Sequence, residues 1–147
     1  MREINLSFTS RSISALTPSL ASDEKSVYQR EFEYVKNDKT PITYIHFGAV
    51  DQKCEVFING KYVGAHRGGY TPFTFEIQNA LIDGTNIIRV ECTDTTEASS
   101  GARGKQSSKP GKIWYTPQSG IWQSVWLESV AENHIKDLTV KTYPHKN

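Results

Sequence analysis

Short runs of β-branched and aromatic residues recur along the chain and are separated by turn-forming residues. Such runs predict β-strands, and no window of about eleven residues keeps the 3.6-residue apolar period of an amphipathic helix. Many short strands without helices are typical of a sandwich or a barrel. The predicted strands cover residues 28–35, 42–50, 54–58, 61–66, 73–77, 87–93, 112–116, 121–130 and 135–142.

The sharpest local pattern is a predicted hairpin between two apolar runs, Val56–Ile58 and Lys61–Gly64. Asn59-Gly60 separates them, and this dipeptide favours a type I′ turn because both central residues need a positive φ. We therefore expect two paired strands joined at Asn59 and Gly60.

Residues 94–112 differ from the rest of the chain, because they are rich in Ser, Gly and Thr and keep no apolar period. A stretch of this length inside a compact domain is usually a functional loop or a solvated, mobile segment. Asp94 and Glu97 open it and are expected to cap or solvate it. From Ala98 to Leu127 there is no acidic residue, whereas Arg103, Lys105, Lys109 and Lys112 fall within this stretch.

Alternation in residues 121–128 predicts two strand faces. The aliphatic face should enter the core, and the opposite face carries two tryptophans that an open surface rarely exposes. We expect Trp122 and Trp126 to lie at a domain interface, with direct ligand contact as the alternative. The aliphatic face comprises Ile121, Gln123, Val125 and Leu127, and the other Trp122, Ser124, Trp126 and Glu128.

The composition of the chain argues against several classes of function, among them nucleic-acid binding, membrane insertion and metal binding. Seventeen basic and sixteen acidic residues give a net charge of +1, which does not suit a nucleic-acid-binding surface. No apolar run reaches the length of a membrane span, and no signal peptide is visible. Cys54 and Cys92 lie in strand-like runs and are expected to be buried free thiols. The histidines lack zinc-ligand spacing, so we expect neither a metal nor another cofactor.

Sequence motifs for catalysis are absent: there is no GxSxG elbow, GxxxxGK[ST] phosphate loop or GxGxxG turn. Glycoside hydrolysis needs two carboxyl groups on either side of the scissile bond. Glu31 and Glu33 share one strand face and are expected to face solvent, and no pattern marks any acid for proton transfer.

Tryptophan and tyrosine side chains suit stacking on sugar rings, although core packing is the alternative. The aromatic residues in question are Trp114, Tyr115, Trp122 and Trp126.

An ordered series of motifs over about residues 4–130 resembles the N-terminal sugar-binding domain of glycoside hydrolase family 2, which includes β-galactosidases, β-glucuronidases and β-mannosidases. The series begins with Tyr28-Gln29-Arg30-Glu31-Phe32, His46–Asp51 and the Asn59-Gly60-Lys61 hairpin. It continues with Gly68–Phe73, Arg103–Gln106, Ile113–Pro117, Ser119–Gln123 and Val125–Glu128.

This resemblance implies an all-β fold, a galactose-binding-like jelly-roll sandwich over residues 1–130 whose first strand is missing. Residues 131–147 would then be a linker and the first strand of an absent immunoglobulin-like domain. A TIM barrel that carries both catalytic glutamates follows in this family, so the chain alone would be inactive. The parent enzyme would hydrolyse O-glycosidic bonds as a β-galactosidase or β-glucuronidase, and it could form homo-oligomers.

The resemblance also implies which residues contact the terminal β-linked sugar beside the barrel. They lie in the loop that leads up to Trp114 and at the two aromatic positions directly after it. The residues are Arg103, Lys105, Gln106, Trp114 and Tyr115. Some family members place an acidic residue on this loop, but residues 98–113 contain none here. This basic loop would favour an anionic group, such as a uronate.

Two other functions remain open at this point: an autonomous carbohydrate-binding module, and a module that mediates contacts between copies of the chain. Neither a nucleic acid nor a membrane is expected as a partner. The cytoplasm is slightly favoured as the location, while a periplasmic or secreted parent stays open because its N-terminus would be missing.

Overall fold

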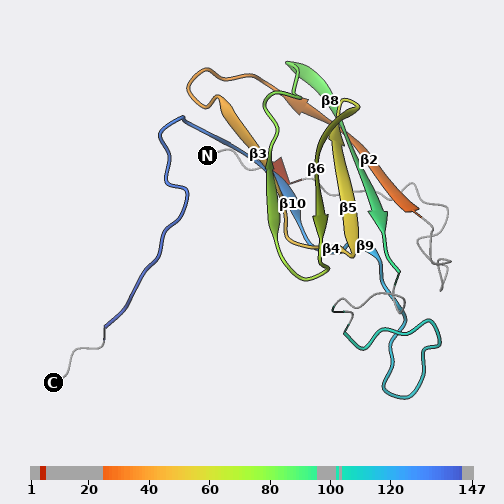
Figure 1. The fold of residues 1–147 in the computed structure, drawn as a ribbon. Coiled ribbons are helices and arrows are strands. Elements are labelled where there is room, and N and C mark those ends of the chain that lie inside the picture. Colours follow the sequence, from red (N-terminus) through yellow and green to blue (C-terminus); the bar gives the residue numbers. More distant parts are fainter. Residues whose placement is uncertain (1–3, 6–24, 96–101, 103, 144–147) are drawn as a thin grey trace.

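The computed structural model describes residues 4–5, 25–95, 102 and 104–143, and these contain ten β-strands and no helix. Figure 1 shows their arrangement. The strands are β1 (Ile4–Asn5), β2 (Lys25–Tyr34), β3 (Ile42–Phe47), β4 (Val50–Asp51), β5 (Lys53–Ile58), β6 (Lys61–Arg67), β7 (Phe73–Glu76), β8 (Gly84–Thr93), β9 (Gly120–Ile121) and β10 (Val125–Val130).

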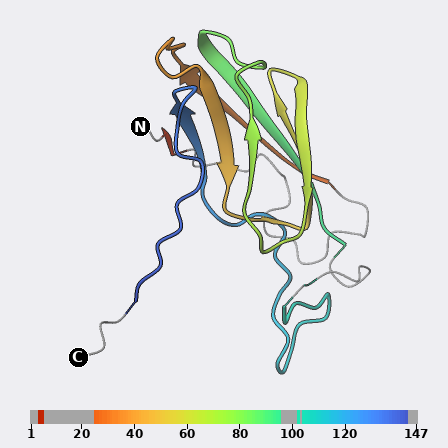
Figure 2. The ribbon, with the colours of Figure 1, turned by 60° about the vertical axis from the view of Figure 1, so that its left-hand side comes forward.

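Two antiparallel four-stranded sheets face each other, as Figures 1 and 2 show. One sheet has the order β1-β10-β3-β7 and the other β2-β8-β5-β6, while β4 and β9 form a short separate pair. The all-β sandwich predicted from the sequence is confirmed.

The core lies between the sheets because strand residues alternate between inside and outside. Along β5, Cys54, Val56 and Ile58 are buried, and β8 buries Ile88 and Val90 in the same way. Removing these apolar side chains from water is the main contribution to the stability of such a fold. Pairing β8 to both β2 and β5 places it in the middle of its sheet.

Both cysteines face the core, as expected. Cys54 and Cys92 are free and buried, and they oppose each other in the pairing of β5 with β8. Burial raises the pKa of the Cys54 thiol to about 11, and it also raises the pKa of Cys92. Both thiols are therefore protonated at neutral pH.

The predicted hairpin is present between β5 and β6. Asn59 has a φ of 52° and Gly60 a φ of 77°, as a type I′ turn requires. The Asn59 amide adds contacts beyond the turn: it donates to the Ala80 carbonyl at 2.9 Å and to Asn86 Oδ1 at 2.8 Å, and its oxygen accepts from the Ile87 amide at 2.9 Å. The turn thus ties the hairpin to the start of β8.

Two predicted strands are interrupted. Residues 42–50 split into β3 and β4 at Gly48, and residues 121–130 split into β9 and β10. The breaks face each other, since the Gly48 amide donates to the Ser124 carbonyl at 2.9 Å. The alternation predicted for 121–128 therefore holds only from Val125 onward, and Gln123 is exposed rather than in the core.

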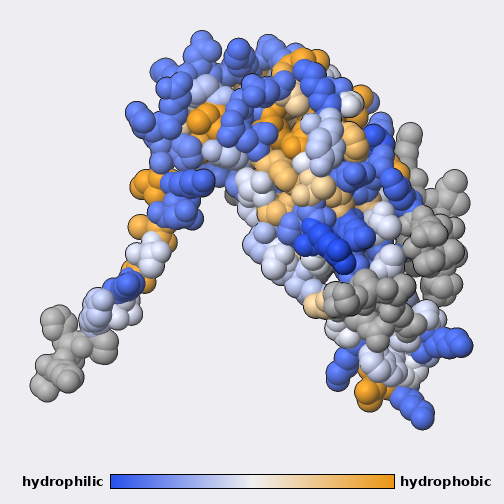
Figure 3. Space-filling view, viewed as in Figure 1, coloured by the Kyte–Doolittle hydropathy of each residue, from blue (hydrophilic) through white to orange (hydrophobic). Residues whose placement is uncertain are grey.

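Two further strand predictions are wrong for the described residues. Residues 112–116 form only isolated bridges, and 131–143 contain no strand. Figure 1 shows the C-terminal segment leaving the sandwich, and Figure 3 shows apolar residues along it. The side chains of Ile135, Leu138, Val140 and Tyr143 are largely exposed, because the apolar pattern lacks a partner sheet. The assignment of this segment to a further domain stays a prediction, as does the absence of a first strand, although β1 pairs with β10.

Candidate functional site

Residues 104–119 form a loop between β8 and β9 that extends beyond one end of the sandwich (Figures 1 and 2). The loop has hydrogen bonds of its own. The Tyr115 amide donates to the Lys105 carbonyl at 2.7 Å, and the Ser107 amide donates to the Tyr115 carbonyl at 3.1 Å. A tight turn pairs Gly111 with Trp114 in both directions, at 3.1 and 3.0 Å. These bonds bring Lys105 and Gln106 together with Tyr115, which lies ten positions after Lys105 in the chain.

Two buried carboxylates of the sandwich hold this loop. Asp51 ends β4 and Asp94 follows β8, and each is only 6% exposed. Gln106 donates its Nε2 to Asp51 Oδ2 at 3.2 Å, and Ser119 donates its hydroxyl to Asp94 Oδ2 at 2.6 Å. Gln106 in turn accepts the Gln118 amide on its Oε1 at 2.5 Å. The loop is thus attached at both of its ends.

Burial governs the electrostatics of this attachment. Desolvation raises the pKa of Asp51, the hydrogen bond from Gln106 lowers it, and the charge of Asp94 raises it, so that the pKa lies above its ordinary value. Both carboxylates are hydrogen-bonded and shielded from solvent. Their arrangement supports the loop.

Trp122 packs against the turn that follows β6. Its indole nitrogen donates to the Gly69 carbonyl at 2.7 Å, and its ring meets the edge of Tyr70 with centroids 5.9 Å apart. At Gly69, an added Cβ would lie 2.4 Å from Asp51 Oδ1, so a larger residue does not fit there without a shift. The turn after β6, the loop and Asp51 therefore form one packed unit.

The structure gives the predicted sugar-contact residues different positions. Lys105 is exposed, and the rings of Trp114 and Tyr115 are 40% and 68% exposed at the end of the molecule. Gln106 is half-buried and supports the loop from within. Arg103 lies outside the described residues. An exposed cation beside aromatic rings is suited to binding a polar ligand that has apolar faces.

Sequence reasoning did not identify Asp51 and Ser119 as supports, and it expected Asp94 to cap or solvate the loop. Both carboxylates follow an apolar strand directly, which is the pattern that could have marked them. Glu31 and Glu33, by contrast, are exposed as expected.

Trp126 lies on a different surface from Trp122. It is half-buried on the outer face of the β1-β10-β3-β7 sheet, where its ring stacks on His46 with centroids 5.0 Å apart. His46 is itself held by Thr74 Oγ1 at 2.8 Å and Glu128 Oε2 at 3.1 Å. The two tryptophans therefore do not form one shared patch.

Metal and membrane sites can be checked within the described part of the chain. No three His, Cys, Asp or Glu side chains gather there in a way that could hold a metal ion. The same residues include no helix of the length and apolarity needed to cross a membrane.

The family model described as "Glycosyl hydrolases family 2, sugar binding domain" matches residues 10–130. A beta-galactosidase of Thermoanaerobacter pseudethanolicus is 35% identical over 116 residues, which cover 77% of this chain and 15% of that protein. A putative beta-glucuronidase of Formosa agariphila is 29% identical over 119 residues, covering 80% of this chain and 13% of the relative. The chain thus spans about a seventh of the length of these relatives.

Solved structures show the same fold. A Bacteroides uniformis beta-glucuronidase aligns with a TM-score of 0.59 and 27% identity, over 73% of this chain and 12% of that one. A beta-D-glucuronidase of Dictyoglomus thermophilum aligns with a TM-score of 0.72 over 99% of this chain and 31% of its own, at 22% identity.

Proposed function

From the premise that this chain belongs to the sugar-binding domain family of the family 2 glycosyl hydrolases, we propose that it serves a longer glycosidase and helps to form its site for the terminal sugar. The proposed parent hydrolyses O-glycosidic bonds as a β-galactosidase or β-glucuronidase. The domain itself is non-catalytic, and the catalytic carboxylates belong to a barrel outside this chain.

One observation carries this proposal: the loop of residues 104–119 is held on buried carboxylates and presents aromatic rings at one end of the sandwich. Asp51 and Asp94 fix the loop through Gln106 and Ser119. A support of this kind keeps binding residues in one geometry, which reduces the entropy lost when a ligand binds. The sugar would lie against Tyr115 and Trp114, with Lys105 beside it.

The two tryptophans predicted at an interface have separate roles in this proposal. Trp126 and His46 form an aromatic surface on the outer face of one sheet, and this face is the one we assign to contact with a neighbouring domain. Trp122 is assigned to support of the turn after β6, because its indole nitrogen already donates to the Gly69 carbonyl.

Backbone amide chemical shifts test the proposal first on the 147-residue chain. Galactose, glucose, mannose and glucuronate are titrated, and we expect no saturable shift at Lys105, Gln106 or Tyr115, since the loop forms only part of the sugar site. Saturable shifts there with one monosaccharide would contradict this and identify an autonomous carbohydrate-binding module instead.

The second measurement uses the longer enzyme. Tyr115→Ala should raise KM for a p-nitrophenyl β-galactoside or β-glucuronide about tenfold, as expected for loss of a stacking contact with the sugar. Ile113→Ala is the matched control, because it removes another exposed apolar side chain from the same loop. Equal kinetics for the two variants would refute the role of the loop in the sugar site.

A further inference from the structure

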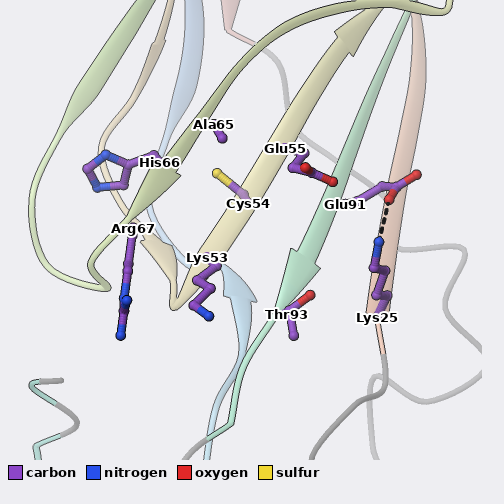
Figure 4. Close-up of a pocket in the computed structure, with 9 residues that line it drawn as sticks. All are labelled: Lys25, Lys53, Cys54, Glu55, Ala65, His66, Arg67, Glu91 and Thr93. Atoms are coloured by element: carbon purple, nitrogen blue, oxygen red, sulfur yellow. Dashed lines mark hydrogen bonds and ion pairs between the residues drawn. The ribbon is translucent and has the colours of Figure 1, made fainter. Parts of the chain in front are cut away.

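Three cations form a row across one end of the β2-β8-β5-β6 sheet. In the strand pairing, Lys25 lies opposite Thr93, and Lys53 lies opposite both Thr93 and Arg67. We call these four residues the cationic row. Figure 4 shows their side chains side by side across the strands, on the outer face of the sheet.

Only one of the three cations in this row has an ion pair within the described residues. Lys25 pairs with Glu91 at 3.2 Å, and Glu91 also pairs with Arg89. Within the described part of the chain, neither Lys53 nor Arg67 has an ion pair, although they stand directly opposite each other. Like charges in that position destabilise a sheet, so an anion between them would relieve a cost that the fold already bears.

A pocket of about 450 Å³ adjoins the row. Its lining includes the cations Lys25, Lys53 and Arg67 and the carboxylates Glu55 and Glu91. The hydrogen bond from Lys25, together with the charge of Arg89, holds the pKa of Glu91 below its ordinary value. This carboxylate is therefore already paired with Lys25 and Arg89. Glu55 lies opposite Glu91 in the pairing of β5 with β8. With three cations and two carboxylates, the lining carries one net positive charge, which favours an anion.

Charge and aromatic rings are arranged along the same face. Beyond the row lies Phe57, with the Arg89 guanidinium 4.3 Å from its ring centroid and the edge of Tyr62 beside it. Phe57 follows Lys53 by four positions, a distance of about 13 Å along a strand and thus about the length of a short oligosaccharide. Tyr62 is 58% exposed and offers a surface for a sugar ring.

We propose that the cationic row binds an acidic substituent, a carboxylate or a sulfate ester, of a saccharide chain whose neighbouring sugar units extend toward Tyr62. The saccharide class rests on the proposed function, whereas the anion preference rests on the row itself. Arg67 can hold either group through two parallel hydrogen bonds, and Lys53 and Thr93 can donate further ones. The row also adjoins the loop supports, because Thr93 directly precedes Asp94 and Lys53 follows Asp51 by two positions.

Amide chemical shifts of the 147-residue chain test this proposal at low ionic strength. The three probes are trigalacturonate, a sulfated galactotriose and neutral galactotriose. We expect at least one acidic probe to give saturable shifts at Lys53, Arg67 and Thr93, while the neutral probe leaves these amides unchanged. The acidic probe that binds identifies the source of the charge, and added salt should weaken its binding, because exposed charges are screened.

Two double variants distinguish binding at the cationic row from a general effect of the protein's positive charge. The double substitution Lys53→Gln and Arg67→Gln should weaken binding of the acidic probe about tenfold, since it removes two exposed charge contacts. The matched control, Lys36→Gln with Lys39→Gln, removes the same charge from the opposite end of β2. Both proteins should keep their dispersed amide spectra, which shows that they fold.

Each outcome decides one proposal. Shifts of the row amides that the double variant abolishes support the inference, even if the loop amides respond to no sugar. Acidic probes that shift only the loop amides overturn the inference, as do equal losses of affinity in both double variants or no shift at all. The proposed function is tested separately, by the kinetics of the Tyr115→Ala variant of the longer enzyme.

Discussion

Single residues decide where this chain turns and what its loop rests on. Asn59 and Gly60 adopt positive φ angles that most residues avoid, and the Asn59 side chain then binds three backbone or side-chain groups around Ala80, Asn86 and Ile87. Asp51 and Asp94 act in a comparable way on the loop, because each offers a buried acceptor to one loop residue.

Substitution of Gly60 tests the turn. Gly60→Val should lower the free energy of unfolding by about 1–3 kcal/mol, because a β-branched side chain opposes a φ of 77°. No heavy atom lies within 4 Å of the added Cβ, so the cost comes from the backbone and not from a clash. Urea denaturation measures it, with Gly60→Asn as the control. Equal stability of the two variants would show that the turn does not need a positive φ.

At the scale of elements, the outer faces of the two sheets differ. The β1-β10-β3-β7 sheet carries Trp126 stacked on His46, whereas the β2-β8-β5-β6 sheet carries the cationic row at one end and Glu31 and Glu33 at the other. Inner faces are alike, since both consist of aliphatic and aromatic residues. The core therefore determines the sandwich fold, and the outer faces determine which chemical groups each sheet offers to a partner.

Alanine substitutions on neighbouring positions of β10 test the assignment of Trp126. Leu127 is buried, and Leu127→Ala should cost about 2–5 kcal/mol in the isolated chain. Trp126→Ala should cost clearly less there, because the ring is half-exposed, but should lower the stability of the longer protein more strongly. Thermal or urea unfolding of both forms measures this. The same loss from Trp126→Ala in the chain and in the longer protein would place the ring in the domain's own core.

At the scale of the whole molecule, the loop and the sandwich are joined through groups whose ionisation is coupled to folding. Asp51, Asp94, Gln106 and Ser119 come from segments far apart in the sequence and meet at one end of the sheets. The pKa of Asp51 is raised chiefly by burial, so its charged form is disfavoured in the folded state. Folding and loop attachment therefore depend on pH through this residue.

The pH dependence of stability tests this coupling. Because the folded pKa of Asp51 is raised, the folded chain holds this proton to higher pH than the unfolded chain, and its contribution to stability falls as pH rises from about 4 through the raised value. Asp51→Asn cannot ionise, so its free energy of unfolding should decline less over this range. Denaturation at a series of pH values measures the difference, with exposed Glu31→Gln as the control. An unchanged slope in Asp51→Asn would contradict the assignment.

Local sequence determined most of the strands between Lys25 and Thr93, the hairpin and the buried thiols, because alternation and turn chemistry depend on neighbours within a few residues. It also placed Lys105 in the loop, whereas it predicted a strand at Trp114 and Tyr115; the part of all three residues in sugar binding stays a proposal. Tertiary structure alone decided the breaks opposite Gly48, the separation of Trp122 from Trp126, the burial of Asp51 and Asp94, and the cationic row. Each of these arises where segments distant in sequence meet, and alternation within one strand carries no information about which strand will lie opposite it.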